Sequence, residues 1–412
     1  MASIGNIFIA GREQHGGIYK CGIMFSMKAI SPDNIILDLQ NNSWQVEFFK
    51  NTNQIVARTL NELSKEDLLS QGFQIVQQTL DLLSIKGILS TTLESPAKSH
   101  RGIYHSSGRL IFYCYALAEL PISIDFSIKR IDLNGNEIKE ESTPSPQINW
   151  HESFRYYRLS QSTSDLFEAY RNLFLALEAL LNKICPKKKA EQEGIWLRRS
   201  LNEVNKKAKL SQFAPSTVKD AIEFIIKSQY KDIRCKLQHA KMPQAKLPHS
   251  QLDPADVQYA YSELVRIWRH IASTHLYISE GGGVVTYEGF SYMMLNTFSS
   301  SPNIFYTTDT SPPTHQDTKI SPQGLPTYKI ESANFFEKYK PGVVRIIGME
   351  DIHIQDPRFL MPISRIAFMT NDVVFSILYI KDGLQLIGID AWECIQDLQL
   401  VNASQPKTEF QN

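Results

Sequence analysis

The sequence predicts an α+β protein in which a central all-α helical bundle is flanked by N-terminal and C-terminal β-rich regions. Three patterns support this: strand-like runs before residue 145, helical periodicity in the middle, and strand-like runs again after residue 341. We therefore divide the chain into a β-rich domain with one helix (1–148), a helical bundle (149–278), a Gly/Ser/Pro-rich loop or linker (279–328) and a β-rich region (329–412).

The β-rich regions contain one expected helix and two marked turn signals. Residues 64–84, "SKEDLLSQGFQIVQQTLDLLS", carry a rough apolar stripe and predict the helix. Asn134-Gly135 predicts a hairpin, because both residues tolerate the positive φ of a type I′ turn, and Asp382-Gly383 predicts that the last strand-like run folds back on itself. The sequence leaves open whether the two β-rich regions pair into one domain.

The helical region shows the strongest periodicity in the chain. Apolar residues recur at 166, 170, 173, 177, 180 and 184, which predicts a helix with one buried face. Asp165 followed by Glu168 resembles a capping box at its start. Further helices are expected over 193–208, from near Pro215, and after Pro254, so the region reads as a bundle of roughly four helices.

Charge is balanced over the whole chain but not along it. The 43 basic and 43 acidic residues cancel, whereas residues 183–246 hold 13 Lys and 3 Arg against 6 acidic residues, a net charge of +10. Such a segment attracts phosphate groups, although runs of like charge are also common in solvated turns between helices. The runs that supply much of this charge include Lys187, Lys188, Lys189, Lys206 and Lys207.

Other site classes find little support. The five cysteines are scattered with no CxxC pair, which argues against a disulfide framework and a zinc ribbon, and no ligand cluster suggests a metal or cofactor. No stretch approaches the ~18 uninterrupted apolar residues of a membrane span. We therefore expect a cytoplasmic protein that has no membrane segment and needs neither metal nor cofactor.

Arg234 and His239, in "YKDIRCKLQHAK", have the chemistry that metal-free RNA cleavage requires. Histidine moves protons near neutral pH, and the planar arginine side chain holds the charge that grows on a phosphate. A spacing of five residues separates the two by about 140° around a helix, so they converge only where the segment is frayed or curved. A similar pair, Arg269 and His275, lies in the last expected helix, where a solvated helix end is the simpler interpretation.

A long helix containing "YRNLFLALEALL", further helices, and Arg-x4-His just before a last helix together resemble the HEPN superfamily. The resemblance is to its abortive-infection and methylamine-utilisation-associated branches and covers about residues 160–277. It implies an all-α bundle that dimerises so that two such motifs meet at the interface. It also implies a metal-independent endoribonuclease that leaves a 2′,3′-cyclic phosphate and serves as a toxin or antiviral-defence effector.

The resemblance assigns roles to particular residues. Arg234 becomes the phosphate-holding cation, His239 the general acid/base, and Glu178, on the long helix, the acid that orients Arg234. Glu178 is equally well explained as a surface carboxylate paired with Lys183 or Arg171. Lys236, Lys241 and Gln238 flank the motif and are candidate RNA contacts, together with the lysine runs given above.

One departure keeps two other functions open. Relatives usually carry a polar residue, often Asn, after the arginine, where this chain has Cys235. An inactive HEPN module that binds RNA or a nucleotide, or only dimerises, is therefore the first alternative. The second is an adaptor in which the β-rich regions bind a regulatory protein partner and the helices are a scaffold.

Overall fold

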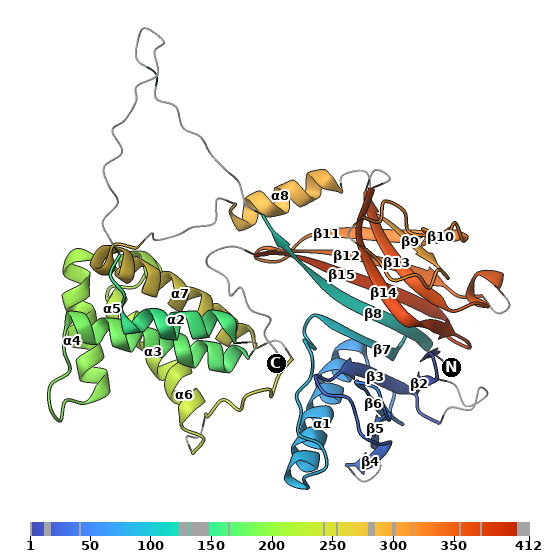
Figure 1. The fold of residues 1–412 in the computed structure, drawn as a ribbon, viewed down its shortest axis with the longest axis horizontal. Coiled ribbons are helices and arrows are strands. Elements are labelled where there is room, and N and C mark those ends of the chain that lie inside the picture. The colour runs from blue at the N-terminus through green and yellow to red at the C-terminus, as the bar shows by residue number, and fades with distance from the viewer. Residues whose placement is uncertain are drawn as a thin grey trace.

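The computed structural model shows a mixed α+β protein with two large β-sheets and a group of helices (Figure 1). The structure describes residues 2–11, 18–40, 43–122, 131, 148–163, 165–241, 244–252, 254–278, 285–298, 302–314, 316–353, 356–370 and 373–401.

Each sheet combines strands from both ends of the chain. The six-stranded sheet has the order β10 (Thr327–Lys329), β9 (Asn303–Thr307), β13 (Ile363–Thr370), β14 (Val373–Leu386), β1 (Ala2–Ile4) and β2 (Ile7–Ala10). The nine-stranded sheet has the order β11 (Ser332–Lys340), β12 (Val343–Asp351), β15 (Ala391–Val401), β8 (Arg109–Pro121), β7 (Ser99–Ser106), β3 (Cys21–Ser26), β6 (Gln54–Thr59), β5 (Trp44–Phe48) and β4 (Ile35–Leu39).

Two strand pairs join the N-terminal and C-terminal β regions into one unit. β8 and β15 run parallel, with Ile111 opposite Ala391 and Cys114 opposite Cys394, and β1 pairs antiparallel with β14. Side chains of both sheets share one core, in which Phe112 of one sheet and Ile366 of the other are fully buried. The question that the sequence left open is thereby answered: the two β-rich regions form one sandwich.

The helix α1 (Lys65–Ile85) covers the other face of the nine-stranded sheet and confirms the helix expected there. Ser64 caps its start by accepting a hydrogen bond from the N–H of Asp67. Leu68, Phe73 and Leu80 of the predicted stripe are buried against the sheet. The apolar stripe therefore has the role that its spacing predicted.

The middle of the chain forms helices that share a separate core. These are α2 (Glu152–Ser162), α3 (Leu166–Ile184), α4 (Glu193–Lys207), a 3₁₀ turn (Ser211–Phe213), α5 (Ala221–Ile225), a π-helix (Ile226–Arg234), α6 (Cys235–Gln238) and α7 (Ala255–Leu276). The expected helices α3, α4 and α7 are confirmed, and Asp165 caps α3 by accepting from the N–H of Glu168. Helix α2 was not expected from the sequence.

Two expectations in the helical and linker regions were wrong. The third helix begins at Ala221 and not near Pro215, because the side chain of Asp220 provides the N-cap by accepting from the N–H of Glu223. The expected linker 279–328 contains helix α8 (Tyr287–Thr297) and strand β9. Helix α8 packs on the sandwich through Phe290 and Met294, an apolar pair at helical spacing.

The Ser/Pro-rich part of that segment is held in place by hydrogen bonds to buried charges. The carboxylate of Asp309 accepts from the hydroxyls of Ser311 and Ser321 at 2.6 and 2.7 Å. Arg365, which is fully buried, donates to the carbonyl of Ile320 at 2.8 Å and pairs with Asp317. Composition alone did not reveal these long-range partners.

Asp382-Gly383 does not form the expected hairpin. β14 continues through both residues. Its pairing register with β13 shifts between Ile363, which pairs with Leu384, and Arg365, which pairs with Tyr379. Gly383 has a φ of +73°, a conformation that glycine adopts without strain, and it therefore accommodates the register shift within a continuous strand. A short 3₁₀ helix, Pro357–Phe359, precedes β13. The other hairpin signal, Asn134-Gly135, lies outside the described residues.

Candidate functional site

The Arg234 to His239 motif spans a change of helix type and a helix end. The N–H of Cys235 donates to the carbonyl of Tyr230, the i to i−5 bond of the π-helix, and α6 then adds only four residues. At His239 the backbone leaves the helix, with φ −118° and ψ 80°. The motif therefore occupies the irregular kind of segment that its five-residue spacing requires.

The guanidinium of Arg234 lies beside two aromatic rings, which stack on each other, and beside one carboxylate. Its Cζ lies 5.7 Å from the ring centre of Phe174 and 5.5 Å from that of Tyr230. Its Nη2 donates to Oε1 of Glu178 at 3.3 Å. Its Nε is buried and finds no hydrogen-bond acceptor among the described residues. Arg234 is thus positioned by its contacts with the two rings and by one ion pair, and it carries one buried donor that no described acceptor satisfies.

Glu178 is a carboxylate whose charge is disfavoured where it stands. The side chains of Glu178 and Arg234 are each 18% exposed. Burial raises the pKa of Glu178 to about 7, and the neighbouring Glu193 also raises it, although Arg234 opposes the shift. Arg171, one of the two alternative partners of Glu178, pairs instead with Glu168.

A second ion pair lies beside the first. Nζ of Lys187 is 2.6 Å from Oε2 of Glu193 and 5.9 Å from the ring centre of Trp196. Lys187 was expected to contact RNA, and it is engaged with this carboxylate at the edge of the Arg234 cluster. Sequence reasoning missed Phe174, Tyr230 and Glu193. The signal for the two rings is helical spacing, since each lies four residues before a charged residue of the site, Glu178 or Arg234.

His239 is exposed and lies at the C-terminal end of α6. Its backbone N–H donates to the carbonyl of Cys235 at 3.1 Å. Within the part of the chain that the structure describes, its ring contacts neither Arg234 nor Glu178 through a hydrogen bond or an ion pair. One chain by itself therefore does not bring together the two halves of the predicted catalytic pair.

The residues that flank the motif have mixed environments. Nζ of Lys236 is 3.4 Å from Asp232, and the carbonyl of Lys236 accepts from the N–H of Lys246. Gln238 and Lys241 are exposed. Cys235 is half-buried and lies beside Tyr230, whose pKa is raised to about 12 by burial and by this thiol.

The basic segment 183–246 contains many ion pairs, and its basic residues still outnumber its acidic ones by ten. All six of its acidic residues pair with cations of the same segment: Glu191 with Arg199, Glu193 with Lys187, Glu203 with Lys206, Asp220 and Glu223 with Arg198, Glu223 also with Lys231, and Asp232 with Lys236. Lys188, Lys189 and Lys207 are exposed. Exposed lysines that form no ion pair within the described part of the chain are suited to contact a phosphate backbone.

Arg269 of the second Arg/His pair has a structural partner, since it donates to the hydroxyl of Tyr157 at 3.1 Å. Burial and the nearby Lys207 lower the pKa of His275, whose Nε2 is buried without a hydrogen-bond partner among the described residues. His270, the polar residue after Arg269, contacts the carbonyl of Lys209 at 3.1 Å. The contacts of Arg269 and His270 hold α7 to its neighbours and favour a structural role for these two residues.

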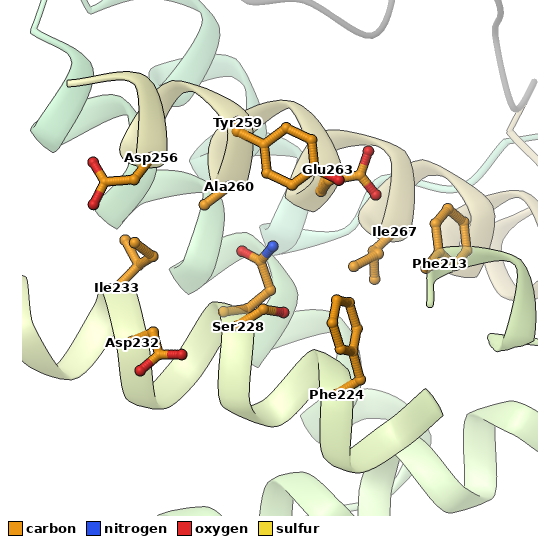
Figure 2. Close-up of a pocket in the computed structure, with 11 residues that line it drawn as sticks. Phe213, Phe224, Ser228, Asp232, Ile233, Asp256, Tyr259, Ala260, Glu263 and Ile267 are labelled. Carbon is orange, nitrogen blue, oxygen red and sulfur yellow. The ribbon is translucent and has the colours of Figure 1, made fainter. Parts of the chain in front are cut away.

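A cavity of about 210 Å³ lies between the π-helix and α7 (Figure 2). Its lining includes Asp232 from the π-helix and Asp256 and Glu263 from α7, above an apolar floor. The three carboxylates pair with Lys236, Lys246 and Arg266, respectively. Neither Arg234 nor His239 lines the cavity, so it is separate from the predicted site.

Across the described ranges, no group of three or more His, Cys, Asp or Glu side chains is arranged to hold a metal ion. In the same part of the chain, no helix combines the length and apolar character needed to cross a membrane. No protein-family model, curated protein or solved structure matches this chain.

Proposed function

We propose that the helical region is a HEPN-type module and that the protein is a metal-independent endoribonuclease acting on single-stranded RNA or tRNA. The observation that carries the proposal is the setting of Arg234. This arginine lies beside two aromatic rings, pairs with a partly buried carboxylate, and stands five residues before an exposed histidine at a helix end. This is the arrangement of a cation kept in position for an incoming phosphate.

In the proposed reaction, the 2′-hydroxyl of the RNA attacks the adjacent phosphate and the 5′-oxygen leaves. His239 transfers the protons, and Arg234 stabilises the charge on the phosphate oxygens. Glu178 is a positioning residue that holds Arg234 until the phosphate replaces it as the partner of the guanidinium. The products are a 2′,3′-cyclic phosphate and a free 5′-hydroxyl.

The active form in this proposal is a homodimer. The side chains of His239 and Arg234 share no hydrogen bond or ion pair within the described part of one chain, and in this proposal a second copy brings a histidine to each arginine. Exposed lysines of the basic segment then guide RNA to the shared cleft. We propose that the protein acts in the cytoplasm as a toxin or antiviral-defence effector, with the β-sandwich binding a regulatory protein partner.

The test is cleavage of single-stranded RNA and of tRNA by the full-length protein in the presence of EDTA. We expect cleavage with cyclic-phosphate ends, and we expect His239→Ala to reduce the rate by about 100-fold or more, the usual contribution of a general acid/base. His353→Ala, which removes another exposed histidine, is the matched control and retains full activity. Cleavage that EDTA abolishes, or an unimpaired His239→Ala variant, contradicts the mechanism.

A second function is favoured by the same isolated position of His239 and by Cys235. In this alternative the module binds RNA or a nucleotide without cleaving it. Its signature is RNA binding that falls steeply with salt, survives His239→Ala and yields no product. Reversing the charge of Lys188 and Lys189 then weakens binding, whereas a helical scaffold in an adaptor protein shows no such effect.

A further inference from the structure

A second cavity, an open hollow of about 310 Å³, lies on the β-sandwich, and its lining residues are distant in sequence from Arg234. Its lining comes from the edge strand β2 of one sheet and from strands β4, β5 and β6 at the end of the other. Figure 1 shows these strands near the N-terminus. We call it the Arg58 hollow, after the buried arginine in its lining. Its volume lies at the lower end of the range of ligand pockets.

Arg58 forms a closed structural unit within the hollow. Its guanidinium lies within 5.4 to 6.0 Å of the ring centres of Phe8, Tyr19 and Phe49. Nε donates to the carbonyl of Ile9 at 3.1 Å, Nη1 donates to Glu47 at 2.5 Å, and Nη2 donates to the carbonyl of Phe8. Each guanidinium nitrogen thus has an acceptor, and the side chain is only 3% exposed.

This unit excludes two classes of ligand. An anion would bind weakly here, because Glu47 already neutralises the charge of Arg58 and each guanidinium nitrogen already has an acceptor. An organic cation is disfavoured, because the guanidinium of Arg58 already lies near all three rings and Glu47 is already paired with it. A neutral ligand remains.

The rest of the lining shows which neutral ligand fits. The amides of Asn6 and Gln45 offer hydrogen-bond donors and acceptors, and Glu47, at 22% exposure, offers acceptor oxygens. Ile18 and Ile36 form an apolar rim and are 64% and 56% exposed. Aromatic surface, hydrogen-bonding groups at the edge and an apolar rim suit a flat heterocycle with donors and acceptors around its edge.

We propose that the Arg58 hollow binds a nucleobase, carried by a free nucleotide or by an RNA strand. The base packs on the aromatic surface and hydrogen-bonds to Gln45, Asn6 and Glu47, while its ribose and phosphate face solvent. This proposal does not depend on RNA cleavage at Arg234, and a protein without nuclease activity tests it equally well.

The experiment measures binding to the full-length chain by calorimetry and ligand-detected NMR. The probes are the four nucleoside monophosphates, a short single-stranded RNA, and ribose 5-phosphate, which lacks a base. We expect binding of base-containing probes, tighter for purines because they stack over more area, and no binding of ribose 5-phosphate. Mononucleotide binding that Ile36→Asp weakens identifies a free nucleotide as the ligand of the hollow. Much tighter binding of the RNA identifies the strand only where Ile36→Asp weakens it too, because the basic segment can bind RNA independently.

Two substitutions in the hollow provide the variants. Ile36→Asp, at an exposed rim position, and Gln45→Leu each reduce affinity by at least about tenfold. Ile85→Asp, at an 84% exposed isoleucine at the end of α1, is the matched control and leaves affinity unchanged. The proposal is overturned if no base-containing probe binds at millimolar concentration, if ribose 5-phosphate binds as well as the nucleotides, or if both variants bind normally.

Discussion

The charge state of Glu178 controls how strongly Arg234 is held. In its charged form the carboxylate competes with any phosphate for the guanidinium, and in its neutral form it leaves the positive charge of Arg234 uncompensated. Because burial brings the pKa of Glu178 to about 7, both forms are populated near neutral pH. A small change in environment, such as the arrival of a phosphate or of a second chain, is then enough to shift the balance.

The same carboxyl group predicts a pH-dependent stability. Its pKa rises from 4.5 to about 7 on folding, so the folded chain holds a proton in this window that the unfolded chain has lost. The corresponding stabilisation is present at pH 5 and is lost as the pH rises through 7. Glu178→Gln removes this titration. The free energy of unfolding of the variant minus that of the parent should therefore be about 2 kcal/mol larger at pH 8 than at pH 5.

Urea unfolding at the two pH values measures this difference. Glu168→Gln on the same helix is the control, because the side chain of Glu168 is 51% exposed, and it should shift stability equally at both pH values. A Glu178→Gln variant whose stability relative to the parent does not change with pH would show that Glu178 is ionised normally.

At the scale of elements, β14 shows how one glycine keeps a strand continuous. Gly383 has a φ of +73°, and a Cβ added there lies 2.6 Å from Cβ of Pro362. Gly324 has a φ of +74° with no heavy atom within 4 Å of the added Cβ. The two positions therefore share a backbone conformation that strains any residue other than glycine, and they differ in steric crowding.

This contrast gives a matched pair of substitutions. Gly324→Ala should lower the free energy of unfolding by about 1 kcal/mol through backbone strain alone. Gly383→Ala should cost about 1–3 kcal/mol more, because Pro362 and the strand beside it must move. Thermal and chemical unfolding of both variants measure the difference, and equal losses would mean that the contact with Pro362 is easily relieved.

At the scale of the whole molecule, the helical region is inserted into the β-sandwich. The chain leaves the sandwich after β8 and returns to it with α8, while β15 at the end of the described chain pairs along β8. The helices have a core of their own that includes Tyr170, Trp268 and many leucines. The β-sandwich therefore depends on both ends of the chain, and the helical region does not.

Truncation tests this division. A fragment of residues 148–278 should fold alone, because its buried face is complete, and should show a cooperative loss of helical circular dichroism on heating. A fragment of residues 1–122 should not fold cooperatively, because it lacks β15 beside β8 and β14 beside β1. A stable, cooperative 1–122 fragment would contradict the view that the sandwich is one unit.

The sequence by itself determined those helices in which apolar residues recur with a strong helical period. Helices α1, α3 and α7 follow from apolar residues that recur at helical spacing, and the capping residue Asp165 marks the start of α3. These features were predictable because they depend on residues within a few positions of each other. The motif from Arg234 to His239 was identified for the same reason.

Only the tertiary structure decided how distant segments meet. Three contacts join residues that are far apart in the chain: the parallel pairing of β8 with β15, the burial of Arg365 of β13 against the Ser/Pro-rich loop, and the contacts of Arg234 with Phe174 and Glu178. Gly383 also resembles a hairpin signal until its strand neighbours are known. Such contacts depend on the geometry of the whole fold. A buried charge is stable only when a partner distant in sequence pairs with it, and a glycine or proline that locally favours a turn can be held in another structure by its neighbours in space.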